Sequence, residues 1–178
     1  NPFEIKLAVS RPADKIVQSA YICYEQQKLG IIKHLFRLKA PQRVIVFASS
    51  KLKVKDLAIV LRRSGYNVGA MHSDLQQAER DEVMYKFKAQ QIDVLVATDI
   101  VARGIDIDDI QLVINYDVPH DAEDYVHRIG RTARANNEGE AVTFVGEMEQ
   151  IGFAAIERFL EVEIEKKSVP EELGEAPL

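Results

Sequence analysis

Short apolar runs alternate along the chain with segments in which apolar residues recur every three or four positions. The short runs have the length and β-branched content of buried strands, and the longer period is typical of amphipathic helices. Because the two patterns alternate, the chain is predicted to be an α/β protein with a parallel sheet and helices on both faces. We expect about six strands, near residues 19–24, 44–47, 67–71, 92–97, 112–116 and 141–145, and helices near 28–38, 51–64, 74–88, 121–129 and 148–160.

Capping signals place the ends of two of these helices. Ser49 and Ser50 are candidate N-cap residues for the second helix, and Gly65 should end it. Asp74 followed by Gln77 resembles a capping box, so we expect the third helix to begin at Asp74.

The length of 178 residues fits one domain with a sizeable core. Residues 1–15 hold two prolines and read as an interdomain linker, 16–160 as the domain, and 161–178 as an acidic, loose C-terminal tail. The chain starts without methionine, which suggests a piece of a longer protein. No apolar run is long enough to span a membrane, and the single cysteine, Cys23, favours a reduced core residue and a cytoplasmic setting.

The formal net charge of −5 argues weakly against nucleic-acid binding by the chain as a whole. The charge is uneven, because residues 28–63 hold ten Lys/Arg and one acid while the remainder holds thirteen basic and twenty-seven acidic residues. Residues 28–63 could therefore present a basic face. Charge alone favours a simpler interpretation, in which these lysines solvate two helices.

The densest cluster of candidate functional side chains lies in residues 127–134, where Arg128, Arg131 and Arg134 flank Gly130 in the sequence. Arginine offers a planar fork of donors that fits phosphate oxygens, so the cluster indicates an anionic partner rather than only a solvated patch. Gly130 should end a helix, which frees Arg131 and Arg134 to point away from Arg128. Arginines brought to a triphosphate from a second domain can neutralise charge on the transferring phosphoryl group.

A second polar segment follows the strand near 92–97. Thr98-Asp99 comes first, and Arg103-Gly104 then precedes Asp106, which stands between two isoleucines. Gly104 permits close backbone approach. Asp106 is either a turn residue or a carboxylate that accepts a hydrogen bond from a ribose hydroxyl. The residues alone do not decide between these two interpretations.

Two weaker signals have simpler explanations of equal or greater weight. Ser50 caps a helix, and the same helix N-terminus could bind a backbone phosphate. Gln77 and Arg80 share one side of a helix's first turn, which suits phosphate and 2′-hydroxyl contacts, although capping and a surface ion pair explain them as well. The sequence lacks a Walker-type phosphate loop, a zinc-ligand set and a Gly-x-Ser-x-Gly signature.

Taken together, these segments resemble the C-terminal RecA-like domain of the DEAD-box RNA helicases. Residues 44–50 resemble motif IV of that family, 77–80 its Gln-x-x-Arg motif, 97–107 motif V and 127–134 motif VI. The resemblance covers roughly residues 15–160, and the wording of the last segment is most similar to the bacterial RhlE-type group.

The resemblance implies a RecA-like fold and a role for each matched residue. The domain would form half of an ATP-driven motor for local RNA unwinding, inactive without its N-terminal RecA-like domain, which would hold most of the Mg²⁺ contacts. Contacts to RNA would be to the backbone, with little sequence preference. The implied roles are arginine fingers for Arg131 and Arg134, ATP binding for Gly104 and Asp106, RNA binding for Ser50, Gln77, Arg80 and Thr98, and interdomain coupling for Arg103, His127 and Arg128.

Two positions depart from the family's pattern, and two rival functions stay open. Ser73 and Ala133 stand where the family usually has glycine, and Ser73 could crowd a backbone contact to RNA. One rival is a binding-only RNA or protein adaptor, in which Arg131, Arg134 and Asp106 would have no purpose. The other is a related motor that acts on DNA.

Overall fold

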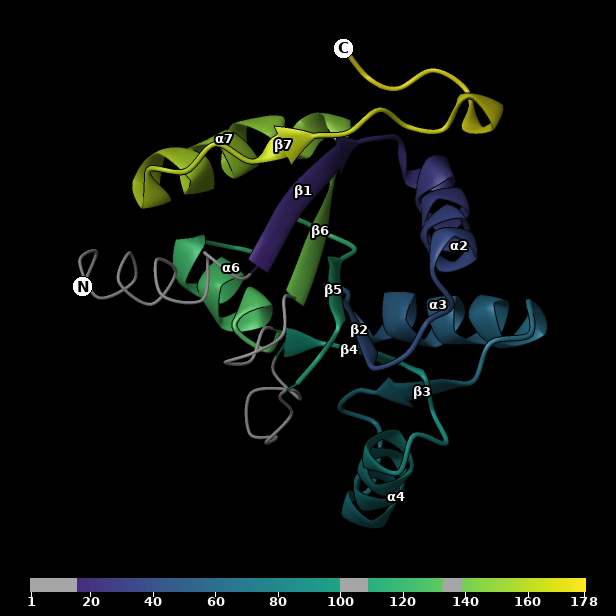
Figure 1. Cartoon of the computed structure of the whole chain (residues 1–178). Helices are drawn as coiled ribbons and strands as arrows, with labels where there is room; N and C mark the ends of the chain where they lie inside the picture. Colours follow the sequence, from purple (N-terminus) through teal and green to yellow (C-terminus); the bar gives the residue numbers. More distant parts are fainter. Residues whose placement is uncertain (1–15, 100–108, 133–138) are drawn as a thin grey trace.

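A computed structural model of the chain describes residues 16–99, 109–132 and 139–178. The predicted linker, residues 1–15, lies outside them. The described part is one parallel sheet with the strand order β3-β4-β2-β5-β6-β1-β7 (Figure 1). The strands are β1 (Ile16–Ile22), β2 (Val44–Phe47), β3 (Val68–Met71), β4 (Val94–Ala97), β5 (Leu112–Asn115), β6 (Gly139–Val145) and β7 (Glu165–Lys166).

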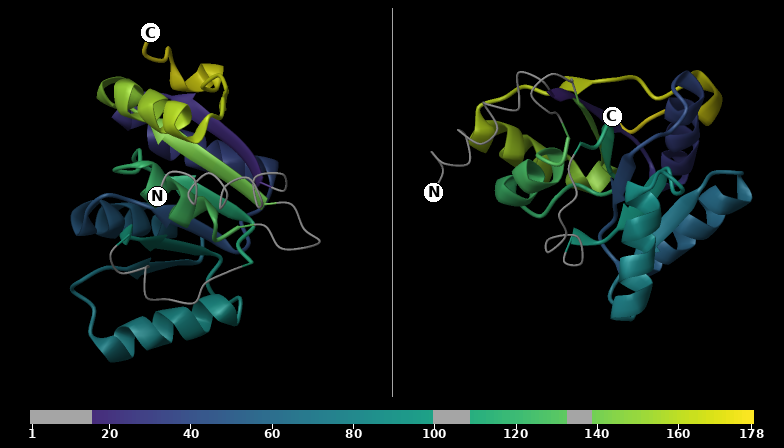
Figure 2. Two further views of the ribbon diagram at one scale, coloured as in Figure 1. Left: turned by 90° about the vertical axis from the view of Figure 1, so that its left-hand side faces the viewer. Right: turned by 60° about the horizontal axis from the view of Figure 1, so that its bottom comes forward.

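Helices cover both faces of the sheet, and the inner strands β2 and β4 are accordingly apolar throughout. In β2, Val44 and Val46 pack toward α2 and α3, and Ile45 and Phe47 pack toward the opposite face. That second face is covered by α4 at one end and by α6 and α7 at the other (Figures 1 and 2). The helices are α2 (Lys28–Leu38), α3 (Lys51–Arg63), α4 (Gln77–Lys88), α6 (Ala122–Ile129) and α7 (Gln150–Leu160), with short 3₁₀ turns at η1 (Glu25–Gln27), η2 (Glu147–Glu149) and η3 (Glu171–Leu173).

The predicted α/β architecture is confirmed, with the two-residue β7 added to the six expected strands. Ser50 caps α3 as expected, since its Oγ accepts a hydrogen bond from the Lys53 N–H at 3.2 Å. Gly65 follows that helix with a φ of +97°, a conformation that glycine adopts without a side-chain clash. No described helix combines the length and apolar character needed to cross a membrane.

The predicted start of α4 is wrong. The helix begins at Gln77, and its N-cap is Gln76, whose N–H donates to the Glu79 Oε1 at 2.8 Å. Asp74 lies two residues before this N-cap, and its carboxylate accepts hydrogen bonds from two lysines of α3. Local spacing suggested a capping box at Asp74, whereas the structure forms one at Gln76 and Glu79.

Residues 161–178, which we call the C-terminal strap, are packed against the domain rather than loose. β7 pairs with β1, and Ile164 is buried. The side-chain Nε2 of Gln27 donates to the carbonyls of Leu173 at 3.0 Å and Glu175 at 2.9 Å. In Figure 1 the strap runs in yellow from the end of α7 past β1 to α2. It therefore covers one end of α2.

The contact between the strap and α2 depends on a missing side chain. A Cβ atom at Gly30 would lie 2.5 Å from Leu173 Cδ2, whereas a Cβ at Gly152 of α7 would meet nothing within 4 Å. Gly→Ala in a helix normally stabilises by about 1 kcal/mol. We expect Gly152→Ala to gain about that free energy of unfolding and Gly30→Ala to gain little, because it displaces Leu173.

Urea unfolding of the 178-residue chain measures these values, and Leu173→Ala supplies the internal check. In that background, Gly30→Ala should recover the gain of about 1 kcal/mol. Equal stabilisation by Gly30→Ala and Gly152→Ala in the otherwise unchanged chain would show that Leu173 does not pack over α2.

Candidate functional site

The carboxyl ends of β2, β4 and β5 meet at one edge of the sheet, where a hollow of about 520 Å³ opens. Ser50, from the start of α3, and Thr98, which follows β4, both line it. Ser73 reaches the same hollow from the loop after β3. The structure thus brings together two of the four predicted RNA-binding residues. Ser73, which stands where the family usually has glycine, lies with them.

The other two predicted RNA-binding residues, Gln77 and Arg80, lie on the first turn of α4 and do not line this hollow. Gln77 is exposed, and its Nε2 donates to Asp81 Oδ1 at 3.0 Å. Arg80 is half-buried, and its buried Nε has no hydrogen-bond partner within the described residues. Gln77 is therefore paired along its own helix, while Arg80 keeps an unused donor.

Arg128 lies inside the domain, with 5 % of its surface exposed. Its guanidinium pairs bidentately with Asp99, with Nε donating to Oδ1 at 2.8 Å and Nη2 to Oδ2. Nη1 donates to the Asn115 Oδ1 at 3.2 Å and the Asp117 carbonyl at 3.1 Å. The same group lies 5.4 Å from the centre of the Phe47 ring. Arg128 therefore joins α6 to the ends of β4 and β5.

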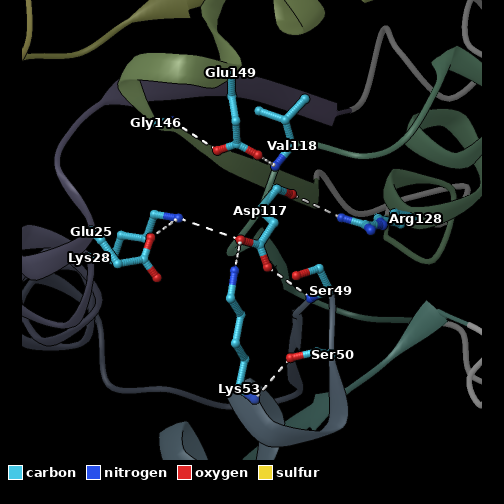
Figure 3. Close-up of polar contacts among 10 residues, drawn as sticks. All are labelled: Glu25, Lys28, Ser49, Ser50, Lys53, Asp117, Val118, Arg128, Gly146 and Glu149. Carbon is cyan, nitrogen blue, oxygen red and sulfur yellow. Dashed lines mark hydrogen bonds and ion pairs between the residues drawn. The ribbon is translucent and has the colours of Figure 1, made fainter.

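Asp117, two residues after the end of β5, is the centre of a second buried junction (Figure 3). Its Oδ2 accepts from the Ser49 N–H at 2.8 Å, and its Oδ1 accepts from Lys53 Nζ at 2.8 Å. Burial by itself would raise the pKa of Asp117, but these two hydrogen bonds and the charges of Lys28 and Lys53 outweigh it and lower the pKa. The ionised carboxylate thereby fixes the start of α3, including the Ser49-Ser50 turn.

Lys28, at the start of α2, supplies the third side of this junction. It is 1 % exposed, and its Nζ lies 2.7 Å from Glu25 Oε2, 3.6 Å from Asp117 Oδ1 and 4.8 Å from the centre of the Tyr116 ring. Glu149 of η2 closes the far side by accepting from the N–H groups of Val118 and Gly146, also drawn in Figure 3. Each charged group named in this junction thus has an ion-pair or hydrogen-bond partner.

The chain after α6 lies beside the chain that leads into β5. The Ile110 N–H donates to the Arg131 carbonyl at 3.1 Å, and Ile110 forms a parallel bridge with Thr132. The Thr132 hydroxyl donates to the Ile110 carbonyl. Arg131 itself is half-buried and His127 is exposed. This pairing places Arg131 next to the residues that follow the predicted ATP-binding segment.

Five residues singled out in the sequence lie outside the described ranges. They are Arg103, Gly104 and Asp106 in one segment and Ala133 and Arg134 in another. Within the described ranges, no group of three His, Cys, Asp or Glu side chains could hold a metal ion. Cys23 is buried, and burial raises the pKa of its thiol to about 11, so it is protonated at neutral pH.

Comparison with known proteins gives one consistent result. Residues 27–136 match the helicase conserved C-terminal domain family. The ATP-dependent RNA helicase CshA of Listeria monocytogenes is 42 % identical over 146 residues, which are 82 % of this chain and 28 % of that protein. The chain thus spans under a third of this relative's length.

Two solved structures share the fold over nearly their whole length. The E. coli DEAD-box protein SrmB, solved bound to regulator of ribonuclease activity A, has a TM-score of 0.81 and 35 % identity, covering 92 % of this chain and 95 % of that chain. The C-terminal domain of the DEAD-box protein Dbp5 has a TM-score of 0.81 and 32 % identity, covering 88 % and 92 %. The chain belongs to the helicase conserved C-terminal domain family. Within it, the chain is similar to the C-terminal domains of DEAD-box RNA helicases. The finer resemblance to the RhlE-type group stays a prediction.

Proposed function

We propose that this domain supplies the second half of an ATP-dependent RNA helicase, with Arg131 and Arg134 as arginine fingers. The nucleotide would sit mainly on an N-terminal RecA-like domain of the same protein. The observation that carries the proposal is the backbone pairing of Arg131-Thr132 with Ile110, because Ile110 follows Asp106 by only four residues in the sequence.

ATP, when bound, would supply the phosphoryl transfer whose free energy drives the motor. On this domain, Asp106 would accept a ribose hydroxyl, and Gly104 would let the backbone approach the nucleotide. Mg²⁺ would be held mainly by the N-terminal domain. The fingers would stabilise charge on the transferring group only when the two domains close.

RNA would lie across the edge of the sheet at which the carboxyl ends of β2, β4 and β5 meet. Ser50 and Thr98, which share the hollow there, would contact the sugar-phosphate backbone, and Gln77 and Arg80 would contact it from α4. Backbone contacts would give little sequence preference, and closure would bend one strand and open a short duplex locally.

Arg103, His127 and Arg128 would couple the two domains. For Arg128 the support is indirect, because its bonds to Asp99 tie the arginine segment to the start of the 97–107 segment. His127 is exposed on the same helix and could reach the partner domain. We place this activity in the cytoplasm, as the single buried cysteine favours.

ATP hydrolysis by the chain alone and joined to its own N-terminal domain tests the proposal. We expect no turnover by the 178-residue chain and RNA-stimulated turnover by the joined protein. Turnover by the purified chain that disappears in its Arg131→Ala variant would contradict the need for a second domain. A joined protein that binds RNA without hydrolysing ATP would indicate an adaptor, and stimulation by DNA alone would indicate a DNA motor.

A further inference from the structure

Two lysines of α3 converge on one exposed carboxylate. Lys51 Nζ lies 3.1 Å from Asp74 Oδ1, and Lys55 Nζ lies 2.6 Å from Asp74 Oδ2. The lysines are one helical turn apart, so they occupy the same side of α3. Hydrogen bonds from Lys55 and Lys51 lower the pKa of Asp74 to about 2, so the carboxylate is ionised at neutral pH.

This cluster adjoins the hollow described above through Lys51. Lys51 lines that hollow together with Ser50, Ser73 and Thr98. Lys55 lines a neighbouring hollow of about 740 Å³ between α3 and α4. The lysine pair is therefore continuous with the surface proposed to hold the RNA backbone.

Asp74 has no other structural task that would explain its position. It does not cap α4, because Gln76 and Glu79 do so one turn later. Its side chain remains 43 % exposed, as do large fractions of both lysines. Exposed ion pairs contribute little to stability, so another anion can replace the carboxylate at small cost.

A phosphodiester group has the chemistry needed to replace it. Two of its oxygens carry the negative charge and can each accept from one ammonium group, as the two Asp74 oxygens do here. We propose that Lys51 and Lys55 form a binding site for a phosphate of the nucleic-acid backbone, and that the Asp74 carboxylate occupies this site in the free domain. The proposal rests on RNA binding at the neighbouring hollow. Asp74 then opposes RNA binding, both by engaging the lysines and by repelling the phosphate.

Binding of a labelled single-stranded oligouridylate to the 178-residue chain, measured over a series of salt concentrations, tests this site. Asp74→Asn should tighten binding about fivefold at low salt. It should also steepen the slope of log affinity against log salt by about 0.7, since the site neutralises one further phosphate of the single strand. Adding Lys51→Gln and Lys55→Gln to Asp74→Asn should abolish both gains.

Glu172→Gln is the matched control, because it removes the same charge from an exposed pair with Arg37 that does not line the hollow. An Asp74→Asn variant that behaves like Glu172→Gln, or that binds more weakly than the parent chain, overturns the site.

A second experiment uses pyrophosphate, whose binding is followed by NMR shifts of the α3 amides. It separates failure of this site from failure of the proposed function. Binding of pyrophosphate to Asp74→Asn but not to the triple variant, with no RNA binding by any variant, would support the phosphate site and contradict the RNA assignment. No pyrophosphate binding to Asp74→Asn would overturn the site.

Discussion

Replacing Arg131 by alanine in the joined two-domain protein should lower ATP turnover by about a thousandfold or more. An arginine finger acts on charge that develops as the phosphoryl group transfers, so its loss raises the barrier more than it weakens ground-state binding. The affinity for ATP should therefore stay within a few-fold. Arg134→Ala should have an effect of the same kind. The measurements are kcat with saturating RNA and the Kd of a labelled nucleotide.

The backbone around Arg131 makes this variant informative. The Arg131 carbonyl accepts from Ile110, and the following Thr132 is held by Ile110 as well, and neither contact uses the guanidinium. The fold should therefore survive the substitution, and thermal unfolding checks that it does. Arg131→Lys keeps the charge but loses the planar fork, so it should recover only part of the rate. Near-normal turnover by Arg131→Ala would remove the finger assignment.

Much of the fold could be predicted because inner strands such as β2 and β4 are buried on both faces. Val44 to Phe47 is wholly apolar in sequence and wholly buried in the structure, so short-range composition defines the strand. The start of α4 could not be predicted in the same way. Asp74 has two possible partners, the N-terminus of a helix and the lysines of α3, and only the tertiary arrangement decides between them.

The C-terminal strap shows the same limit. Its composition is acidic and includes two prolines, which is typical of a loose end. It is ordered by contacts that local patterns do not reveal, chiefly Leu173 over Gly30 and the Gln27 amide on two strap carbonyls. A buried amide far away in sequence thus satisfies backbone groups that the strap could not satisfy alone.

The candidate site was predictable where a residue follows a strand. Ser50 and Thr98 come after β2 and β4, and the carboxyl ends of parallel strands converge, so their meeting in one hollow follows from topology. Asp117 also follows a strand, and this signal could have revealed it, although its sequence context resembles a turn. Lys28 carries no such signal. It reads as a solvated helix residue, and only the folded chain shows that its ammonium is buried between two carboxylates.

Arg128→Met should lower the free energy of unfolding by about 3–5 kcal/mol, because it removes one partner of a largely buried ion pair. Asp99 would keep its charge without its bidentate donor, and the Asn115 side chain and Asp117 carbonyl would each lose a hydrogen bond. His127→Ala, a change at the preceding, exposed residue of α6, should alter stability by less than about 0.5 kcal/mol. Urea unfolding of the 178-residue chain measures both.

The pair itself can be isolated with Asp99→Asn. If the Arg128–Asp99 contact stabilises the domain as a unit, the single losses should not add. The double variant should then lose less free energy of unfolding than the sum of the two single losses, by at least about 1 kcal/mol. Additive losses would show instead that Arg128 acts through Asn115, Asp117 and the Phe47 ring. A loss below about 1 kcal/mol for Arg128→Met would contradict a structural role altogether. In the joined protein, an Arg128 variant that remains folded at low temperature yet loses RNA stimulation of ATP turnover would show that Arg128 couples the domains. A purely structural contact would change the amount of folded protein. It would not change the response of each folded molecule to RNA.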